Sequence, residues 1–127
     1  MRCLIVDDDA GFRAEVCGLL EEEGVEVVGS AASGAEAVRQ VASLRPDVAL
    51  VDINLRGESG FDLARQMCDG ADGAAPNVIL ISTHDESEYA DLIDASPAAG
   101  FLAKTDLSVV TIRRILDAAA GFEGDDR

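Results

Sequence analysis

Short runs of purely apolar residues, each followed by a polar residue, restrict the fold of this chain more than any other feature of its sequence. The clearest run extends from Val48 to Val51 and is followed by Asp52. A four-residue run without a polar side chain is typical of a strand that is buried on both faces, as in a parallel sheet. Three similar runs and one alternating segment are expected to be the other strands: 3–6, 78–81, 100–103 and 25–31.

Amphipathic segments between these runs predict helices. Ser33 and Glu36 form a capping box at the start of one helix, and Gly24 is expected to end another as its C-terminal cap. Leu19 and Leu92 are expected to face the core because they fall on apolar faces at helical spacing. The expected helices cover about 11–23, 33–44, 60–68, 86–95 and 107–120, and Gly121 is expected to end the last one.

Five strands that alternate with five helices predict one α/β domain, a (βα)5 doubly wound parallel sheet with helices on both faces. The 127 residues are enough to bury roughly two-thirds of the surface of the unfolded chain. The domain is expected to span 1–121, followed by a C-terminal tail at 122–127, either a linker stub or a disordered end. The segment 69–76 is expected to be a flexible loop.

The composition excludes several classes of partner and location. The chain carries 25 acidic and 10 basic residues, a net charge of −15, so it is not expected to bind nucleic acid or an anionic membrane directly. No apolar run approaches the roughly 20 residues that span a bilayer, and Asp7 to Asp9 interrupt the first apolar run, so no signal peptide is expected. The three cysteines, Cys3, Cys17 and Cys68, are expected to be reduced. These features predict a soluble, cytoplasmic protein.

Polar residues that follow the predicted strands are expected to meet at one edge of the sheet. Parallel strands end at the same edge, where ligands of open α/β sheets bind. This edge would collect Asp7, Asp8, Asp52, Ser82 and Lys104. Three crowded carboxylates repel one another, and Mg²⁺, which prefers oxygen ligands, would relieve the repulsion. Zinc is not favoured, because the chain has a single histidine and scattered cysteines.

The same residues predict phosphoryl transfer. Asp52 would be the nucleophile and would form an acyl phosphate. The metal and Lys104 would neutralise the phosphoryl oxygens, and the Ser82 hydroxyl would donate a hydrogen bond to one of them. Lys104 is the only lysine in the chain, since every other cationic side chain is an arginine, and this favours a specific role for it.

These residues, in this order, resemble the receiver domains of bacterial two-component response regulators. The acid pair matches Asp7 and Asp8, the phosphoacceptor matches Asp52 in Val-Asp-Ile-Asn-Leu, the switch hydroxyl matches Ser82, and the lysine matches Lys104. The motifs Arg-Pro-Asp-Val, Gly-Phe-Leu and Lys-Thr-Asp-Leu are similar to those of the NarL/LuxR-type subfamily. The resemblance implies a flavodoxin-like, CheY-like sheet of strand order 2-1-3-4-5.

The resemblance also implies roles for individual residues. Mg²⁺ would be held by Asp8, Asp52 and the main-chain carbonyl of Asn54, with Asp7 helping through water. Phe101 matches the aromatic residue that turns inward on activation. Two alternatives stay open: Thr83 could replace Ser82 as the switch hydroxyl, and His84, like Asn54, lies where receivers tune the hydrolysis of the phosphoryl group, although an exposed histidine without a role fits equally well.

The function that follows is a phosphorylation switch rather than an enzyme. A sensor histidine kinase would be the partner, and the fourth helix, fifth strand and fifth helix would form the output surface and a possible homodimer face. The subfamily normally carries a C-terminal helix-turn-helix domain that binds DNA, so the chain is expected to be either a stand-alone receiver or an excised fragment, with transcription as the regulated process. The alternatives are a phosphorylation-independent interaction module and an aspartyl phosphatase, which would need an acid where Asn54 stands.

Overall fold

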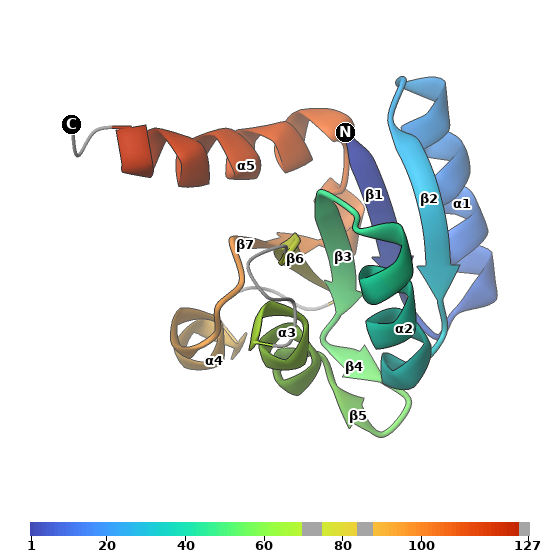
Figure 1. The fold of residues 1–127 in the computed structure, drawn as a ribbon, viewed down its shortest axis with the longest axis horizontal. Helices are drawn as coiled ribbons and strands as arrows, with labels where there is room; N and C mark the ends of the chain where they lie inside the picture. Colours follow the sequence, from blue (N-terminus) through green and yellow to red (C-terminus); the bar gives the residue numbers. More distant parts are fainter. Residues whose placement is uncertain (70–74, 84–87, 125–127) are drawn as a thin grey trace.

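A central parallel sheet organises the computed structural model, which describes residues 1–69, 75–83 and 88–124 (Figure 1). Its five strands lie in the order β2-β1-β3-β6-β7, and all neighbouring pairs are parallel. The strands are β1 (Arg2–Val6), β2 (Glu26–Ala31), β3 (Val48–Asp52), β6 (Asn77–Ser82) and β7 (Gly100–Ala103). The doubly wound fold and the strand order 2-1-3-4-5 expected from the sequence are both confirmed.

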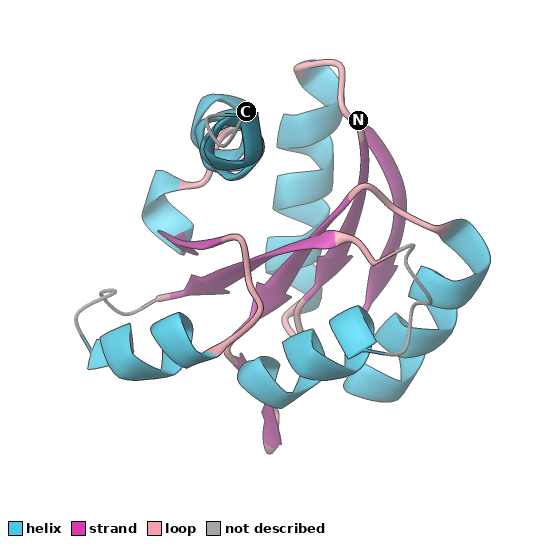
Figure 2. Cartoon of the chain, turned by 60° about the vertical axis from the view of Figure 1, so that its left-hand side comes forward, coloured by secondary structure: helices cyan, strands magenta, loops and turns pink. Residues whose placement is uncertain are grey.

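Helices cover both faces of the sheet (Figure 2). On one face lie α1 (Ala10–Glu22) and α5 (Val109–Gly124), and on the other lie α2 (Gly34–Leu44), α3 (Gly60–Asp69) and α4 (Ala90–Ala95). Within the part of the chain that the structure describes, none of these helices combines the length and apolar character needed to cross a membrane.

Alternate residues of each strand supply two separate apolar cores. In β3, Ala49 and Val51 pack against α2 and α3, whereas Val48 and Leu50 pack against α1 and α5. All four are completely buried. Because side chains alternate between the faces of a strand, a strand covered by helices on both sides must be apolar at every position, as predicted for this run.

Helix ends follow the predicted chemistry. The Ser33 hydroxyl accepts a hydrogen bond from Glu36 N (3.3 Å) at the start of α2, and Glu36 Oε1 accepts one from Ala32 N (2.7 Å). Gly24 has a φ of +87° directly after the C-cap of α1, a conformation that favours glycine. The Ser33 N-cap and the glycine cap are therefore confirmed, whereas Glu36 bonds Ala32, the residue before the N-cap, rather than Ser33 N as in a capping box.

Several predicted details are wrong. Leu19 and Leu92 are 41% and 51% exposed rather than facing the core. Leu20 takes the buried position beside Leu19, and in α4 the neighbouring Ile93 contacts the core instead of Leu92. Gly121 does not end α5. It lies within the helix, which continues to Gly124.

Other predicted features fall outside the described residues. These are the centre of the 69–76 loop at 70–74, the start of the fourth helix with His84 at 84–87, and the chain end at 125–127.

A small hairpin after β3 was not predicted. The sequence indicated only a turn, but β4 (Asn54–Leu55) and β5 (Glu58–Ser59) pair antiparallel there. Arg56 and Gly57, the two residues between them, have φ angles of +28° and +86°. Positive φ at both central residues is the geometry of the tightest hairpin turns.

Candidate functional site

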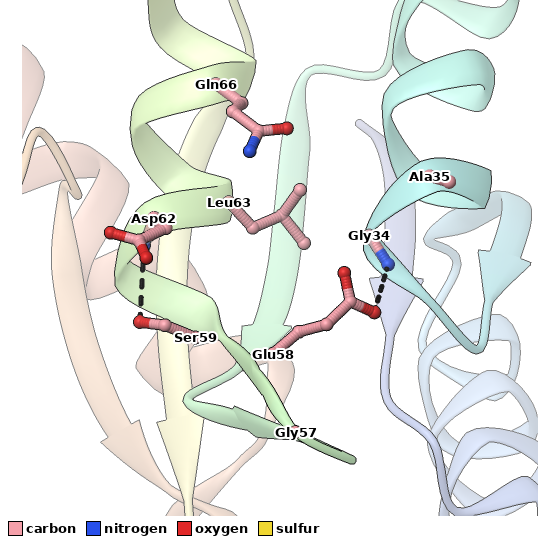
Figure 3. Close-up of a pocket in the computed structure, with 8 residues that line it drawn as sticks. All are labelled: Gly34, Ala35, Gly57, Glu58, Ser59, Asp62, Leu63 and Gln66. Carbon is pink, nitrogen blue, oxygen red and sulfur yellow. Dashed lines mark hydrogen bonds between the residues drawn. The ribbon is translucent and has the colours of Figure 1, made fainter.

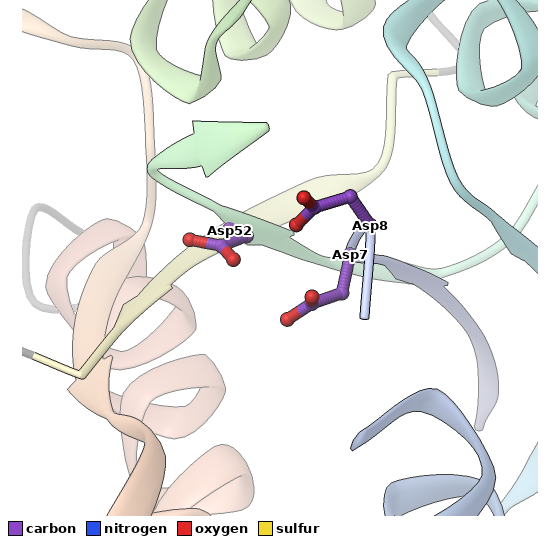
Figure 4. A group of neighbouring side chains, drawn as sticks. All are labelled: Asp7, Asp8 and Asp52. Carbon is purple, nitrogen blue, oxygen red and sulfur yellow. The ribbon is translucent and has the colours of Figure 1, made fainter. Parts of the chain in front are cut away.

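Three aspartates meet at the carboxyl edge of the sheet (Figure 4). Asp7 and Asp8 follow β1, and Asp52 is the last residue of the adjacent strand β3. One carboxylate oxygen of each lies within 4.8 Å of the others. Asp7 is completely buried and Asp52 is 7% exposed, whereas Asp8 is half-buried. The predicted meeting of these acids is therefore present in the structure.

Backbone groups orient two of the carboxylates. Asp7 Oδ1 accepts a hydrogen bond from Asp9 N (2.9 Å), and Asp52 Oδ1 accepts one from Asn54 N (3.0 Å). The Arg13 guanidinium donates to the main-chain carbonyl of Asp7. In both carboxylates the Oδ1 atom is thus held by the backbone, and the Oδ2 atom is directed toward a cation.

That cation is Lys104, which directly follows β7. Its Nζ lies 2.6 Å from Asp7 Oδ2 and 3.2 Å from Asp52 Oδ2. Its side chain is only 14% exposed, so the ion pairs form in a poorly solvated site where they are stronger than on an open surface. The aromatic ring of Phe12 covers the ammonium, with its centroid 4.2 Å from Nζ.

The electrostatics of the cluster favour an added cation. Burial raises the pKa of Asp52, and the negative charge of Asp7 raises it further, while the Asn54 N–H and Lys104 act in the opposite direction. Burial alone would lower the pKa of Lys104, but its hydrogen bond and ion pairs with Asp7 and Asp52 outweigh burial and raise it. One lysine therefore stays charged, and it cannot neutralise three carboxylates.

The donor set fits Mg²⁺. This ion takes oxygen ligands and keeps several waters, so it needs only a few protein oxygens close together. The three aspartate oxygens meet that requirement, and Asp8 and Asp52 are the less buried members that a hydrated ion could reach. Carboxylate oxygens and water suit Mg²⁺, Ca²⁺ and Mn²⁺ rather than the softer metals that favour nitrogen or sulfur ligands.

A second cation lies at the outer side of the cluster. Arg56 Nε is 3.5 Å from Asp8 Oδ2, and the arginine side chain is 84% exposed. Solvent screens so exposed a pair, and such pairs contribute about 0–1 kcal/mol. The sequence offered no signal for this contact, because it depends on the unpredicted hairpin turn.

Close packing fixes the loop that leaves Asp52. Gly60 N donates to the Ile53 carbonyl (2.7 Å), and a Cβ atom at Gly60 would lie 2.3 Å from the Asp52 carbonyl oxygen. Any other residue at this position would therefore displace the backbone of the predicted nucleophile.

The hairpin after Asp52 is tied to α2 by a glutamate (Figure 3). Glu58 Oε1 accepts a hydrogen bond from Gly34 N (3.1 Å) across a pocket between α2 and α3. A carboxylate at the N-terminus of a helix is favoured by the helix dipole as well as by the hydrogen bond. Glu58 therefore anchors the hairpin, a role that its sequence position did not indicate.

The remaining predicted site residues lie around this cluster. Ser82 ends β6, the strand beside β3, and is buried, whereas Thr83 is exposed. Asn54 is exposed at the start of β4. Phe101 lies in β7 beside Leu80 and packs partly against the core. His84 lies outside the described residues.

Comparison with known proteins identifies the class of protein that this fold and site define. The family model of the response regulator receiver domain matches residues 3–116. The chain therefore belongs to the response regulator receiver domain family. Receiver domains of this family bind Mg²⁺ at an acidic pocket and are phosphorylated by sensor kinases, and this chain has a cluster of three aspartates at the carboxyl edge of its sheet.

Individual relatives include transcription regulators of the NarL/LiaR type. The transcriptional regulatory protein LiaR of Bacillus subtilis is 30% identical over 123 residues, which are 95% of this chain and 57% of LiaR. The probable transcriptional regulatory protein NarL of Mycobacterium tuberculosis is 34% identical over 122 residues, 95% of this chain and 56% of that protein. A protein-glutamate methylesterase/protein-glutamine glutaminase of Alkalilimnicola ehrlichii is 44% identical over 109 residues, 82% of this chain and 27% of that enzyme.

Solved structures agree with this placement. The receiver domain of NarL from Mycobacterium tuberculosis has a TM-score of 0.78 at 34% identity, covering 94% of this chain and 96% of that one. A LuxR-family two-component response regulator from Aurantimonas has a TM-score of 0.80 at 28% identity, covering 94% of this chain and 85% of that one. The predicted resemblance to NarL/LuxR-type receivers is confirmed. The chain spans only about a quarter to just over half of the length of the three curated relatives above.

Proposed function

We propose that Asp52 of this receiver accepts a phosphoryl group from a sensor histidine kinase in a two-component signalling pathway. The observation that carries the proposal is the position of Lys104 Nζ, 3.2 Å from Asp52 Oδ2, beside the cluster of three aspartates. A nucleophilic carboxylate, an ammonium group and a site for a divalent cation are the parts that phosphoryl transfer requires.

In the proposed transfer, a carboxylate oxygen of Asp52 attacks the phosphorus atom of the kinase phosphohistidine. The O–P bond forms as the N–P bond breaks, and the electron pair of that bond leaves with the imidazole nitrogen. Lys104 neutralises one phosphoryl oxygen, and the Ser82 hydroxyl donates a hydrogen bond to another. Mg²⁺ bound by Asp8, Asp52 and the Asn54 carbonyl, with Asp7 acting through water, would neutralise further charge.

Phosphorylation is proposed to act as a switch. The phosphoryl group adds roughly −1.5 to −2 charges, which would draw Ser82 and Lys104 toward Asp52 and shift an existing equilibrium between two conformations. Thr83 is the alternative switch hydroxyl. Phe101 would turn inward, and Asn54 and His84 would tune how fast water removes the phosphoryl group.

The readout surface is proposed to consist of α4, β7 and α5. None of the six residues of α4 is buried, and Leu92 on α4 and Val110 on α5 are 51% and 65% exposed. Exposed apolar side chains on an output surface favour a protein partner, and a homodimer through this face is part of the proposal. Tyr89, Thr105 and Arg113 belong to the same surface.

The proposed output is transcription control. The alignments with LiaR and NarL each cover 95% of this chain, and both names describe transcriptional regulators. The methylesterase relative aligns with 82% of the chain and makes a catalytic output the second candidate. In either case the receiver is proposed to act in the cytoplasm, to promote only its own phosphorylation and dephosphorylation, and to leave any DNA binding to a separate helix-turn-helix domain.

Two other functions are less well supported. An aspartyl phosphatase needs an acid two residues after its nucleophile to protonate the leaving group, and Asn54 cannot supply a proton there. A phosphorylation-independent module would not need Lys104 beside Asp52. Neither alternative accounts for the arrangement as well as the phosphorylation switch does.

Intact-mass measurement tests the proposal. The protein is incubated with phosphoramidate or acetyl phosphate, with and without Mg²⁺, beside an Asp52→Asn control. We expect the wild type to gain the mass of one phosphoryl group only with Mg²⁺, and the control to gain none. Beryllofluoride, which mimics the acyl phosphate and does not hydrolyse, is added in parallel. A wild type that neither gains mass nor binds beryllofluoride would overturn the proposal.

A further inference from the structure

An aromatic ring on α1 lies against the lysine of the site. Phe12 is in the first turn of α1, and its ring centroid is 4.2 Å from Lys104 Nζ. The ring also contacts the core on the α1 and α5 face of the sheet. Its contact with the ammonium is an additional feature, which core packing does not require.

Two carboxylates and an aromatic ring lie against the Lys104 ammonium. Asp7 and Asp52 provide carboxylates at 2.6 and 3.2 Å, and the Phe12 ring covers another side. The negative face of an aromatic ring attracts a cation, most strongly when the cation is shielded from water. A lysine has a flexible four-carbon stem and loses much rotamer freedom when it is held in place. The ring therefore restricts a side chain that the two carboxylates alone would hold less firmly.

The turn that carries Phe12 is itself fixed to the acidic cluster. Asp9 Oδ1 accepts hydrogen bonds from Gly11 N (2.9 Å) and Phe12 N (3.2 Å). On the other side of Phe12, Arg13 donates to the main-chain carbonyl of Asp7. The ring is thus attached by short connections to the residues that surround Lys104, so its position follows that of the site.

We propose that Phe12 is a positioning residue for phosphoryl transfer, which holds the Lys104 ammonium between Asp7 and Asp52 before the phosphoryl group arrives. The inference rests on the proposed phosphorylation of Asp52. A Lys104 side chain that is already in place can contact the phosphoryl oxygens without first changing its rotamer. Charge that is positioned in advance lowers the activation barrier of phosphoryl transfer.

The chain allows a direct spectroscopic test, because Lys104 is its only lysine. Protein labelled with ¹³C,¹⁵N-lysine gives one set of side-chain NMR signals. Protons above an aromatic face are shifted upfield, so we expect upfield-shifted Hε signals in the wild type. Phe12→Leu should return them toward ordinary lysine positions, and Phe12→Tyr should keep them shifted. Leu20→Val, a core change on the same helix and in the same core, should leave them unchanged.

The rate of phosphorylation by phosphoramidate tests whether the position of Lys104 affects phosphoryl transfer. We expect Phe12→Leu to be slower by about threefold to tenfold, which corresponds to a partly shielded cation–π contact, and Phe12→Tyr to recover most of the wild-type rate. Leu20→Val separates a general loss of stability from the loss of positioning, since it should not slow the reaction.

Each result has a defined meaning. Ordinary Hε positions in the wild type would overturn the contact itself. A wild-type shift together with an unchanged rate in Phe12→Leu, or an equal slowing in Leu20→Val, would overturn the positioning role. Failure of the proposed function is distinguishable, because the wild type would then not be phosphorylated at all, while the NMR signals of Lys104 do not depend on phosphorylation.

Discussion

The interior of the parallel sheet and its carboxyl edge are built from opposite kinds of side chain. Residues Val48 to Val51 of β3 are completely buried and apolar, whereas the next residue, Asp52, is a largely buried carboxylate beside two others. The interior stabilises the fold by removing apolar surface from water. The edge opposes folding, because it concentrates like charges where solvent cannot screen them. Residues that stabilise the fold and a residue of the candidate site are therefore adjacent in one strand. Single substitutions can measure the two contributions separately.

The largest effect is expected in the interior. Leu50→Ala should lower the free energy of unfolding by about 3 kcal/mol, since it removes a fully buried side chain and leaves a cavity. Urea denaturation measures the change. Leu92→Ala is the matched control: the same truncation at a 51% exposed position should change the free energy by no more than about 0.5 kcal/mol. Equal losses in the two variants would contradict the described packing.

A smaller loss of stability is expected where the interior meets the edge. Gly60→Ala should lower the free energy of unfolding by about 2 kcal/mol, because its Cβ would lie 2.3 Å from the Asp52 carbonyl oxygen. The displaced Asp52 should also bind Mg²⁺ more weakly, as titration calorimetry would show. Gly18→Ala is the control, since its Cβ meets nothing within 4 Å in α1, and alanine there should stabilise the helix by up to about 1 kcal/mol. A Gly60→Ala protein with normal stability and Mg²⁺ affinity would refute the tight packing.

At the edge itself, removal of a charge is expected to stabilise the protein. Burial, followed by the charge of Asp7, raises the pKa of Asp52 above 3.8, so the native state holds this proton to a higher pH than the unfolded chain does. The ionised carboxylate therefore lowers the free energy of unfolding. This loss is absent below about pH 3.8, where Asp52 is protonated in both states, and it is complete above the native pKa, where Asp52 is ionised in both.

Asp52→Asn should accordingly raise the urea midpoint at pH 7, and its advantage should shrink as the pH falls toward 4. Mg²⁺ should raise the midpoint of the wild type more than that of the variant. A variant that is less stable than the wild type at pH 7 without Mg²⁺ would show that the ion pair with Lys104 outweighs the crowding of the carboxylates.

The smallest effect is expected at the exposed rim of the edge. Arg56→Gln removes a cation that lies 3.5 Å from Asp8, so Mg²⁺ should bind up to about threefold more tightly at low ionic strength. The gain should disappear in high salt, because the arginine is exposed and screened. Arg65→Gln makes the same charge change on α3, where Arg65 pairs with Asp62, and should have less effect. Equal effects of the two variants would mean that only net charge matters.

The difference between interior and edge also explains how much the sequence could predict. Side chains alternate between the two faces of a strand, and helices bury both faces of this sheet, so its central strands are apolar at every position. The Val48–Val51 run and the similar apolar runs could therefore be recognised as strands from the sequence. Parallel order then placed Asp7, Asp52 and Lys104 at one edge without further information, and the structure confirms this placement.

Contacts that depend on exact backbone angles were not predictable. The ring of Phe12 meets Lys104 only because of the orientation of the first turn of α1, and Arg56 reaches Asp8 through a turn with positive φ at a non-glycine residue. Leu19 and Leu92 were placed wrongly because a helix beside a sheet buries a narrower stripe than its apolar residues occupy. These contacts and burials depend on how the helices and turns pack in three dimensions, which the spacing of apolar residues in the sequence does not predict.

The identity of the acceptor residue is the most direct test of the account. After phosphorylation with phosphoramidate and Mg²⁺, borohydride reduces the acyl phosphate of an aspartate to a stable alcohol, so the modified residue becomes homoserine. Peptide sequencing by mass spectrometry then locates it. We predict homoserine at position 52, in an amount that depends on Mg²⁺. Homoserine at Asp7 or Asp8 instead, or at no aspartate in a protein shown to be phosphorylated, would contradict the assignment of Asp52 as the phosphoacceptor.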